Sequence, residues 1–95
     1  MPTSIIDSFP RQNPRAAMRT IEDQTVVVIP DTSMLFDLNE VASFIWKRMD
    51  GRHNLKKIIE EVENEFDIDH ETATGDAVEL IENMKEAGLA VFDTE

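Results

Sequence analysis

The hydrophobic pattern of this chain changes its period at Asn39, and that change constrains the fold more than any other feature. Before it, Thr25 to Ile29 is almost entirely β-branched, the composition of a strand packed on a core. After it, apolar residues such as Val41, Ala42 and Ile45 recur at the spacings of one helical face. Asn39 is itself a favourable helix N-cap. The sequence therefore predicts a sheet in the first half of the chain and helices in the second.

Two polar breaks divide the first half into three strands. Residues 16–21 alternate in a pattern that fits a first strand. Glu22-Asp23-Gln24 predicts a hairpin turn, and Pro30-Asp31-Thr32 ends the second strand with residues typical of turns. A third strand, from about Ser33 to Asp37, then pairs with the second. Because the links are short, we expect an antiparallel meander with the third strand at one edge.

Capping signals delimit three helices in the second half. Asp50-Gly51 predicts the end of the first helix, and Asn54 and Asp69 are the expected N-caps of the second and third. Gly88 is expected to end the third helix. Gly75 lies inside that helix, where it marks a kink or a close contact, or is simply tolerated.

These elements predict an α+β fold that is winged-helix-like, with a three-stranded antiparallel sheet followed by three helices. The segment Leu89 to Phe92 is expected to add a strand or to cover the core. Residues 1–14 are expected to form a flexible tail, because their three prolines disfavour a helix or a central strand. Residues 15–95 are expected to form one domain. Its predicted core is Val27, Ile29, Leu38, Ile45, Leu55, Ile59, Val62, Leu80, Ile81 and Met84.

The chain contains no cysteine. This excludes disulfides, thiol catalysis and thiolate metal sites, and it is compatible with a reducing cytosol, so we expect a cytoplasmic protein. No N-terminal segment has the charged start and apolar core of a signal peptide. No apolar run approaches the roughly 18 residues of a membrane span, so no membrane partner is expected.

The charge of the chain is concentrated near its C-terminus. The formal net charge is −11, and residues 54–95 carry thirteen acidic and three basic side chains. Such a surface repels phosphate backbones, so duplex nucleic acid is a poor partner. The acidic excess serves solubility alone, or it selects a partner with basic residues.

No group of residues has the spacing of a catalytic or metal site. His70 has acidic neighbours but no second His or Cys at the spacing that a metal requires, and Asp69 is better explained as a cap. Glu60, Glu61 and Glu65 lie on the predicted solvent face of an amphipathic helix. We therefore expect no enzyme activity, no metal and no cofactor.

The third predicted strand has an unprotected apolar centre, Met34 to Phe36. Neither Lys nor Pro interrupts this centre, so a free edge there could accept another strand. An open edge beside a groove favours a peptide binder over a catalyst. Trp46 is expected at the edge of the core, between the first helix and the sheet, because Trp is rarely fully buried.

Five short elements occur in order along the chain: Pro14-Arg15, Leu38-Asn39-Glu40-Val41-Ala42, Ile45-Trp46, Asp50-Gly51 and Gly88-Leu89. Together they resemble the PqqD family, named after pyrroloquinoline quinone biosynthesis protein D, and the resemblance covers about Pro10 to Val91. That family contains recognition domains for ribosomally made, post-translationally modified peptides. The resemblance implies a non-catalytic adaptor that binds the leader of a precursor peptide. It also implies that the adaptor presents this peptide to a modifying enzyme, often a radical-SAM enzyme.

The resemblance further implies where the peptide binds. In the family, the leader adds a strand to the third strand and lies in the groove beside the third helix. Lys85 is the only cation of an acidic helix, and it is expected to pair with a leader carboxylate or with Glu82 or Glu86. The predicted peptide-binding residues are Ser33, Met34, Leu35, Phe36, Asp37, Val78, Ile81, Met84 and Lys85.

Three other readings of the layout remain. A winged-helix arrangement alone also permits a DNA-binding regulator. Charge argues against it, because residues 69–88 contain one Lys, no Arg and six acidic residues. A purely structural subunit of an enzyme complex fits the sequence as well as an adaptor does. An exposed edge strand also allows a homodimer.

Overall fold

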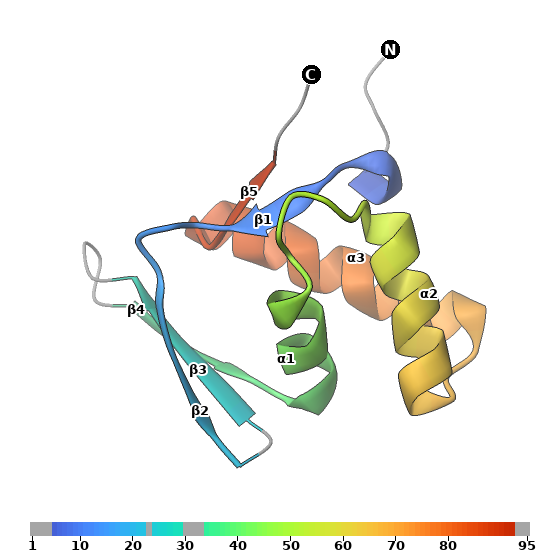
Figure 1. Ribbon diagram of the computed structural model, residues 1–95, viewed down its shortest axis with the longest axis horizontal. Coiled ribbons are helices and arrows are strands. Elements are labelled where there is room, and N and C mark those ends of the chain that lie inside the picture. Colours follow the sequence, from blue (N-terminus) through green and yellow to red (C-terminus); the bar gives the residue numbers. More distant parts are fainter. Residues whose placement is uncertain (1–4, 23, 30–33, 93–95) are drawn as a thin grey trace.

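The computed structural model describes residues 5–22, 24–29 and 34–92. Figure 1 shows a short N-terminal segment, a three-stranded sheet, three helices and a final strand. This order confirms the predicted three-stranded antiparallel sheet followed by three helices. The elements are η1 (Ile5–Asp7), β1 (Pro10–Gln12), β2 (Ala17–Ile21), β3 (Gln24–Ile29), β4 (Met34–Leu38), α1 (Glu40–Lys47), α2 (Leu55–Phe66), α3 (His70–Ala87) and β5 (Ala90–Phe92).

The main sheet is an antiparallel meander with β3 in the middle and β2 and β4 on either side. Its two faces differ in burial, because side chains alternate along each strand: Val27 is buried and Val28 is partly exposed. Directly opposed residues share a face. Phe36 therefore lies on the core face opposite Val27, and Leu35 lies on the outer face opposite Val28.

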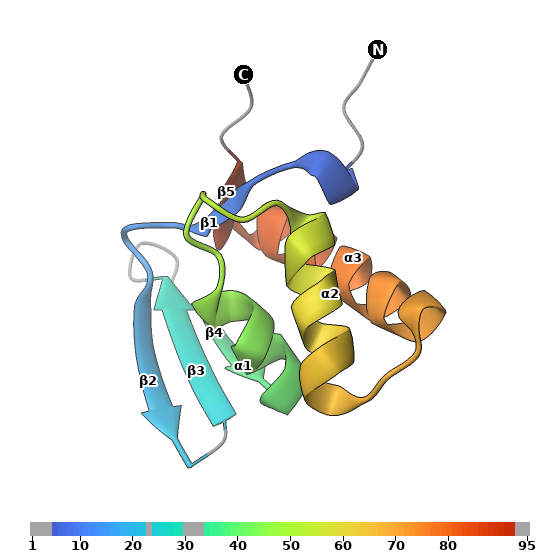
Figure 2. The same ribbon diagram turned by 45° about the vertical axis from the view of Figure 1, so that its right-hand side comes forward.

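Helix α1 lies between the main sheet and the other two helices (Figures 1 and 2). Trp46, near the C-terminal end of this helix, is only 1% exposed. The prediction of a position at the edge of the core is therefore wrong, and Trp46 belongs to the core. The indole Nε1–H donates to the sulfur of Met18 at 2.9 Å. Because this contact occupies the one polar atom of the ring, the whole side chain can be buried.

The three predicted N-caps are all formed. Asn39, Asn54 and Asp69 each accept a hydrogen bond from the backbone N–H three residues later. Gly88 ends α3 with φ of 83°, as predicted, since Gly adopts the left-handed conformation without steric cost. Helix α2 ends at Phe66, and Asp67 takes the same left-handed conformation there, with φ of 55°.

The end of α1 differs from the prediction. The helix stops at Lys47, before the Asp50-Gly51 pair that was expected to end it. Asp50 instead forms an isolated antiparallel bridge with Arg11, and the Gly51 N–H donates to the Pro10 carbonyl at 3.1 Å. Residues 50 and 51 thus lie outside the helix and pair with the N-terminal segment.

The N-terminal segment is folded over residues 5–12, which corrects the prediction of a tail. It contains one turn of 3-10 helix and strand β1, and β1 pairs antiparallel with β5 in a second, two-stranded sheet. The Ser8 carbonyl also accepts from the Leu55 N–H at 2.9 Å. Sequence reasoning missed β1 because it has three residues and a partner at the opposite end of the chain. β5 is the added strand that the Leu89 to Phe92 segment was expected to supply.

The core is built from the apolar stripes of all three helices and the inner face of the main sheet. Every predicted core residue except Leu80 is buried. Leu80 is only partly buried, because it sits at the border between the core stripe of α3 and the surface. The buried apolar residues outside the predicted core list are Ala42, Trp46, Met49, Ile58, Ala73, Ala77, Leu89 and Ala90.

Candidate functional site

The outer side of β4 is an open strand edge. β4 pairs with β3 on one side, and no other described strand pairs with it. Its outward N–H and C=O groups therefore have no ladder partner, the arrangement that accepts an added strand. β4 ends at Leu38, and the next residue, Asn39, caps α1. The open edge thus leads directly to the N-terminus of α1.

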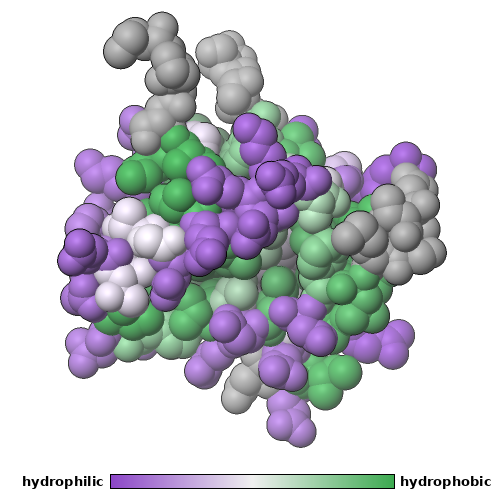
Figure 3. Space-filling model, turned by 180° about the vertical axis from the view of Figure 1, so that it is seen from behind, coloured by the Kyte–Doolittle hydropathy of each residue, from purple (hydrophilic) through white to green (hydrophobic). Residues whose placement is uncertain are grey.

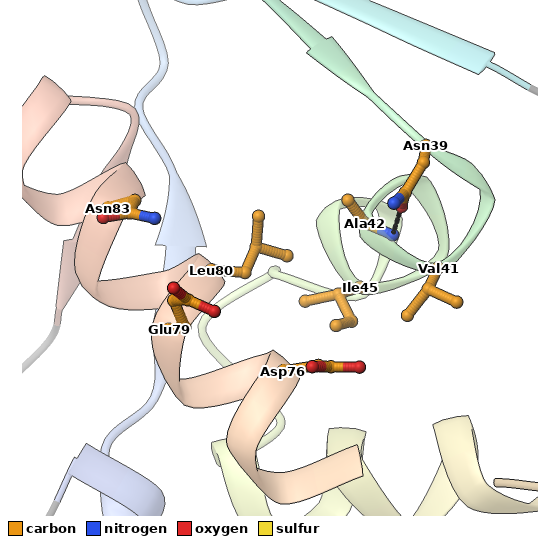
Figure 4. Close-up of a pocket in the computed structure, with 8 residues that line it drawn as sticks. All are labelled: Asn39, Val41, Ala42, Ile45, Asp76, Glu79, Leu80 and Asn83. Atoms are coloured by element: carbon orange, nitrogen blue, oxygen red, sulfur yellow. Dashed lines mark hydrogen bonds between the residues drawn. The ribbon is translucent and has the colours of Figure 1, made fainter. Parts of the chain in front are cut away.

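A groove of about 320 Å³ begins where β4 ends and runs between α1 and α3 (Figure 4). Asp76 and Asn83 are seven residues apart, so they lie on one face of α3. Asn39 lies at the junction of β4 and α1, where its Oδ1 accepts from the Ala42 N–H at 2.8 Å. The groove is lined by Asn39, Val41, Ala42 and Ile45 on one side and by Asp76, Glu79, Leu80 and Asn83 on the other.

The groove combines an apolar floor with an acidic wall. Figure 4 shows Val41 and Ile45 from α1 and Leu80 from α3 pointing into the space between the helices. Asp76 and Glu79 are exposed and come from the same face of α3 as Leu80. Figure 3, seen from behind, shows hydrophilic side chains running across this side of the molecule beside apolar surface. Among the described residues, no Lys or Arg lines the groove.

The predicted β4 residues are divided between the two faces of the sheet. Leu35 is 61% exposed and lies on the outer face, so it is not a groove residue. Asp37 is exposed on the same face. Phe36 lies on the core face and packs against the core. Met34 belongs to β4 opposite Ile29, and Ser33 lies outside the described residues.

On α3, two of the predicted peptide-binding residues lie on a side of the helix that does not line this groove. Val78 and Lys85 are seven residues apart and share a face, but each is offset by two residues from the groove positions Asp76 and Asn83. Two residues are about 200° around a helix, so these two pairs point in nearly opposite directions. Val78 packs against the core instead of lining the groove.

The remaining predicted α3 residues have other roles in this structure. Ile81 and Met84 are 0% and 2% exposed, so they belong to the core and offer almost no surface to a partner. The Lys85 Nζ lies 5.4 Å from the centroid of the Phe92 ring on β5, within the range of a cation–π contact. This aromatic partner was not among those expected for Lys85.

Sequence reasoning missed the wall of the groove. Asp76, Glu79, Leu80 and Asn83 follow the spacing of a single helical face, which is the signal that could have grouped them. The same spacing describes any solvent-facing stripe. Only the packing of α1 against α3 shows that this stripe faces Val41 across a groove.

Two carboxylates outside the groove have lowered pKa values. A hydrogen bond with His53, whose Nδ1 lies 3.0 Å from Asp50 Oδ1, lowers the pKa of the Asp50 carboxyl. The hydrogen bonds that Thr72 donates from its side chain and its backbone lower the pKa of Asp69. Asp50 holds a turn and Asp69 caps α3, so both shifts follow from local structure.

Two other kinds of site are missing from the part of the chain that the structure describes. There, no three His, Asp or Glu side chains are gathered closely enough to hold a metal ion. None of the helices described combines the length and the apolar content needed to cross a bilayer.

Fold and site together define a small α+β domain that presents an open strand edge beside an acidic, apolar-floored groove. The sequence profile of the family described as Coenzyme PQQ synthesis protein D (PqqD) matches residues 24–90. This match covers well over half of the chain, so the protein belongs to the PqqD family. The matched segment runs from β3 to the start of β5 and includes β4, α1 and α3. No curated protein matches the sequence significantly.

Two solved structures have the same fold. One is TbiB1 in complex with the TbiA(beta) leader peptide, which is 19% identical, with a TM-score of 0.79 over 90% of this chain and 99% of that chain. The other is lasso peptide synthetase B1 complexed with the leader peptide, which is 20% identical, with a TM-score of 0.77 over 87% of this chain and 98% of that chain. At these identities the likeness establishes the shared fold.

Proposed function

We propose that this protein is a non-catalytic adaptor that binds the leader of a ribosomally made precursor peptide. The leader adds a strand to the open edge of β4, and the adaptor presents the precursor to a modifying enzyme, such as a radical-SAM enzyme. The observation that carries this proposal is the continuity between the open edge and the groove that starts at Asn39. Membership of the PqqD family and the two similar folds seen with leader peptides support it.

In strand addition, the edge of β4 and the groove make different contributions to binding. The backbone of the leader pairs with the outward groups of β4, which gives affinity with little demand on sequence. Side chains of the leader that reach past Leu38 enter the groove over Val41 and Leu80, which gives selectivity. Neither His nor Ser is among the groove residues, and its two carboxylates are exposed, so the groove suits holding a peptide more than chemistry on it.

The experiment uses a displayed library of random 12-residue peptides selected against the purified protein. Each selected peptide is resynthesised with a single N-methyl group at successive positions, and its Kd is measured. An added strand uses every second N–H of the peptide, so N-methylation should weaken binding with a period of two residues. Weakening without that period, or at one end only, would contradict strand addition.

A further inference from the structure

We infer that the groove between α1 and α3 receives a Lys or Arg side chain of the bound peptide. This inference rests on the proposed function and adds the chemical class of the side chain that the groove selects. In this arrangement the aliphatic part of the side chain lies on the partly exposed Val41 and Leu80, and its cation reaches Asp76 and Glu79.

The composition of the groove matches both parts of a long basic side chain, the apolar stem and the charged end. Lys and Arg bury their methylene stems on apolar surface while keeping the charged end near water. Here the apolar floor lies beside two exposed carboxylates of α3, so the stem and the charge each have a suitable surface. No basic residue in the part of the chain that the structure describes lines the groove, so none of these residues supplies a competing cation for Asp76 and Glu79 there.

Other side chains fit less well. A purely apolar side chain would cover the floor but would also take water away from carboxylates that gain no partner in exchange. An acidic side chain would face like charges at Asp76 and Glu79. The N-terminus of α1 offers little compensation, because Asn39 already accepts the Ala42 N–H.

The charge of the whole chain acts in the same direction. The net charge is −11, and α3 carries acidic residues on its exposed face from Glu71 to Glu86. This field raises the rate at which a basic peptide meets the groove, and salt screens it. The ion pair itself is exposed at the rim, so each carboxylate should change affinity by no more than about fivefold.

The test uses the peptides selected from the random 12-residue library. We expect enrichment of Lys or Arg at one position of the selected sequences. Replacing that residue by norleucine keeps the alkyl stem and removes the charge, and it should weaken binding to the wild-type protein by about fivefold or more. The paired protein variant is Asp76→Asn with Glu79→Gln, for which the loss caused by norleucine should shrink to less than about twofold.

A matched control separates the groove from the overall charge. Glu60→Gln with Glu65→Gln removes the same charge from exposed positions of α2 and should leave the norleucine effect unchanged. If the double variant unfolds, Asp76→Asn and Glu79→Gln are tested one at a time, and at least one of them should shrink the norleucine loss, whereas no reduction in either would overturn the inference.

The outcomes distinguish this inference from the proposed function. Suppose that the selected peptides show the two-residue N-methyl period. If they are not enriched in Lys or Arg, or if the norleucine effect is the same in all protein variants, the inference is overturned and strand addition still holds. A library that yields no binding peptide would overturn both.

Discussion

Gln12 on β1 donates a hydrogen bond from its side-chain Nε2 to the carbonyl oxygen of Trp46, 2.8 Å away, close to the C-terminal end of α1. The neighbouring Asn13 does the same for the end of α3, where its Nδ2 lies 2.7 Å from the Gly88 carbonyl oxygen. Helix ends leave carbonyl groups without partners inside the helix. The N-terminal segment therefore fixes the C-terminal ends of the two helices that form the groove.

We predict that Gln12→Ala lowers the free energy of unfolding by about 1 kcal/mol, because the partly buried Trp46 carbonyl loses its side-chain donor and keeps only the Met49 N–H, at 3.2 Å. Urea unfolding followed by the fluorescence of Trp46, the only Trp in the chain, measures the change. Gln24→Ala, at an exposed strand position, is the matched control and should change stability by less than half as much. If the two variants change the free energy of unfolding equally, the stabilising role assigned to the Gln12 side chain is contradicted.

Gly75 is predicted to be a tolerated residue with no structural requirement. It is exposed inside α3, and a Cβ atom added there would meet nothing within 4 Å. Gly75→Ala should therefore raise the free energy of unfolding by about 0.5–1 kcal/mol. Gly88→Ala should do the opposite, because φ of 83° at the end of α3 is strained for Ala. A destabilising Gly75→Ala would mean that the glycine has a function that the packing does not reveal.

Much of the fold follows from signals that lie within a few residues of one another in the sequence, whereas the groove between α1 and α3 does not. The caps at Asn39 and Asn54 and the stop at Gly88 depend on residues within one turn, so the sequence predicts them well. The pairing of β1 with β5 depends on contacts across nearly the whole chain, and no local pattern contains it. The groove depends on which face of α3 meets α1, and the dual role of Leu80 is visible only after packing.

The stability of the protein should depend on Asp69 at acid pH. Hydrogen bonds from Thr72 hold the folded-state pKa of Asp69 below its ordinary value of 3.8. A depressed carboxyl pKa contributes stability above the unfolded pKa, and this contribution is lost as the pH falls through the folded pKa. Asp69→Asn keeps a capping oxygen but does not titrate. The advantage of the wild type over Asp69→Asn should therefore decline between pH 5 and acid unfolding, and parallel stability curves would contradict the assigned cause.

Peptide binding should distinguish two leucines that sequence reasoning treated differently. Leu80 lines the groove, whereas Leu35 lies on the outer face of the sheet. Leu80→Ala should weaken the binding of a selected peptide by about tenfold, which corresponds to about 1.4 kcal/mol of apolar contact. Leu35→Ala should change the Kd by less than about twofold. Isothermal titration calorimetry of both variants decides, and a larger loss for Leu35→Ala would move the site to the outer face.

The most direct measurement of the central claim is an amide chemical-shift titration of the full chain with a selected 12-residue peptide. Strand addition predicts that the largest shifts fall in β4, in residues 39–45 and on the groove face of α3, with intermolecular contacts from the peptide backbone to β4. Shifts confined to α2 or to the segment of η1 and β1, with residues 34–38 unmoved, would contradict the account.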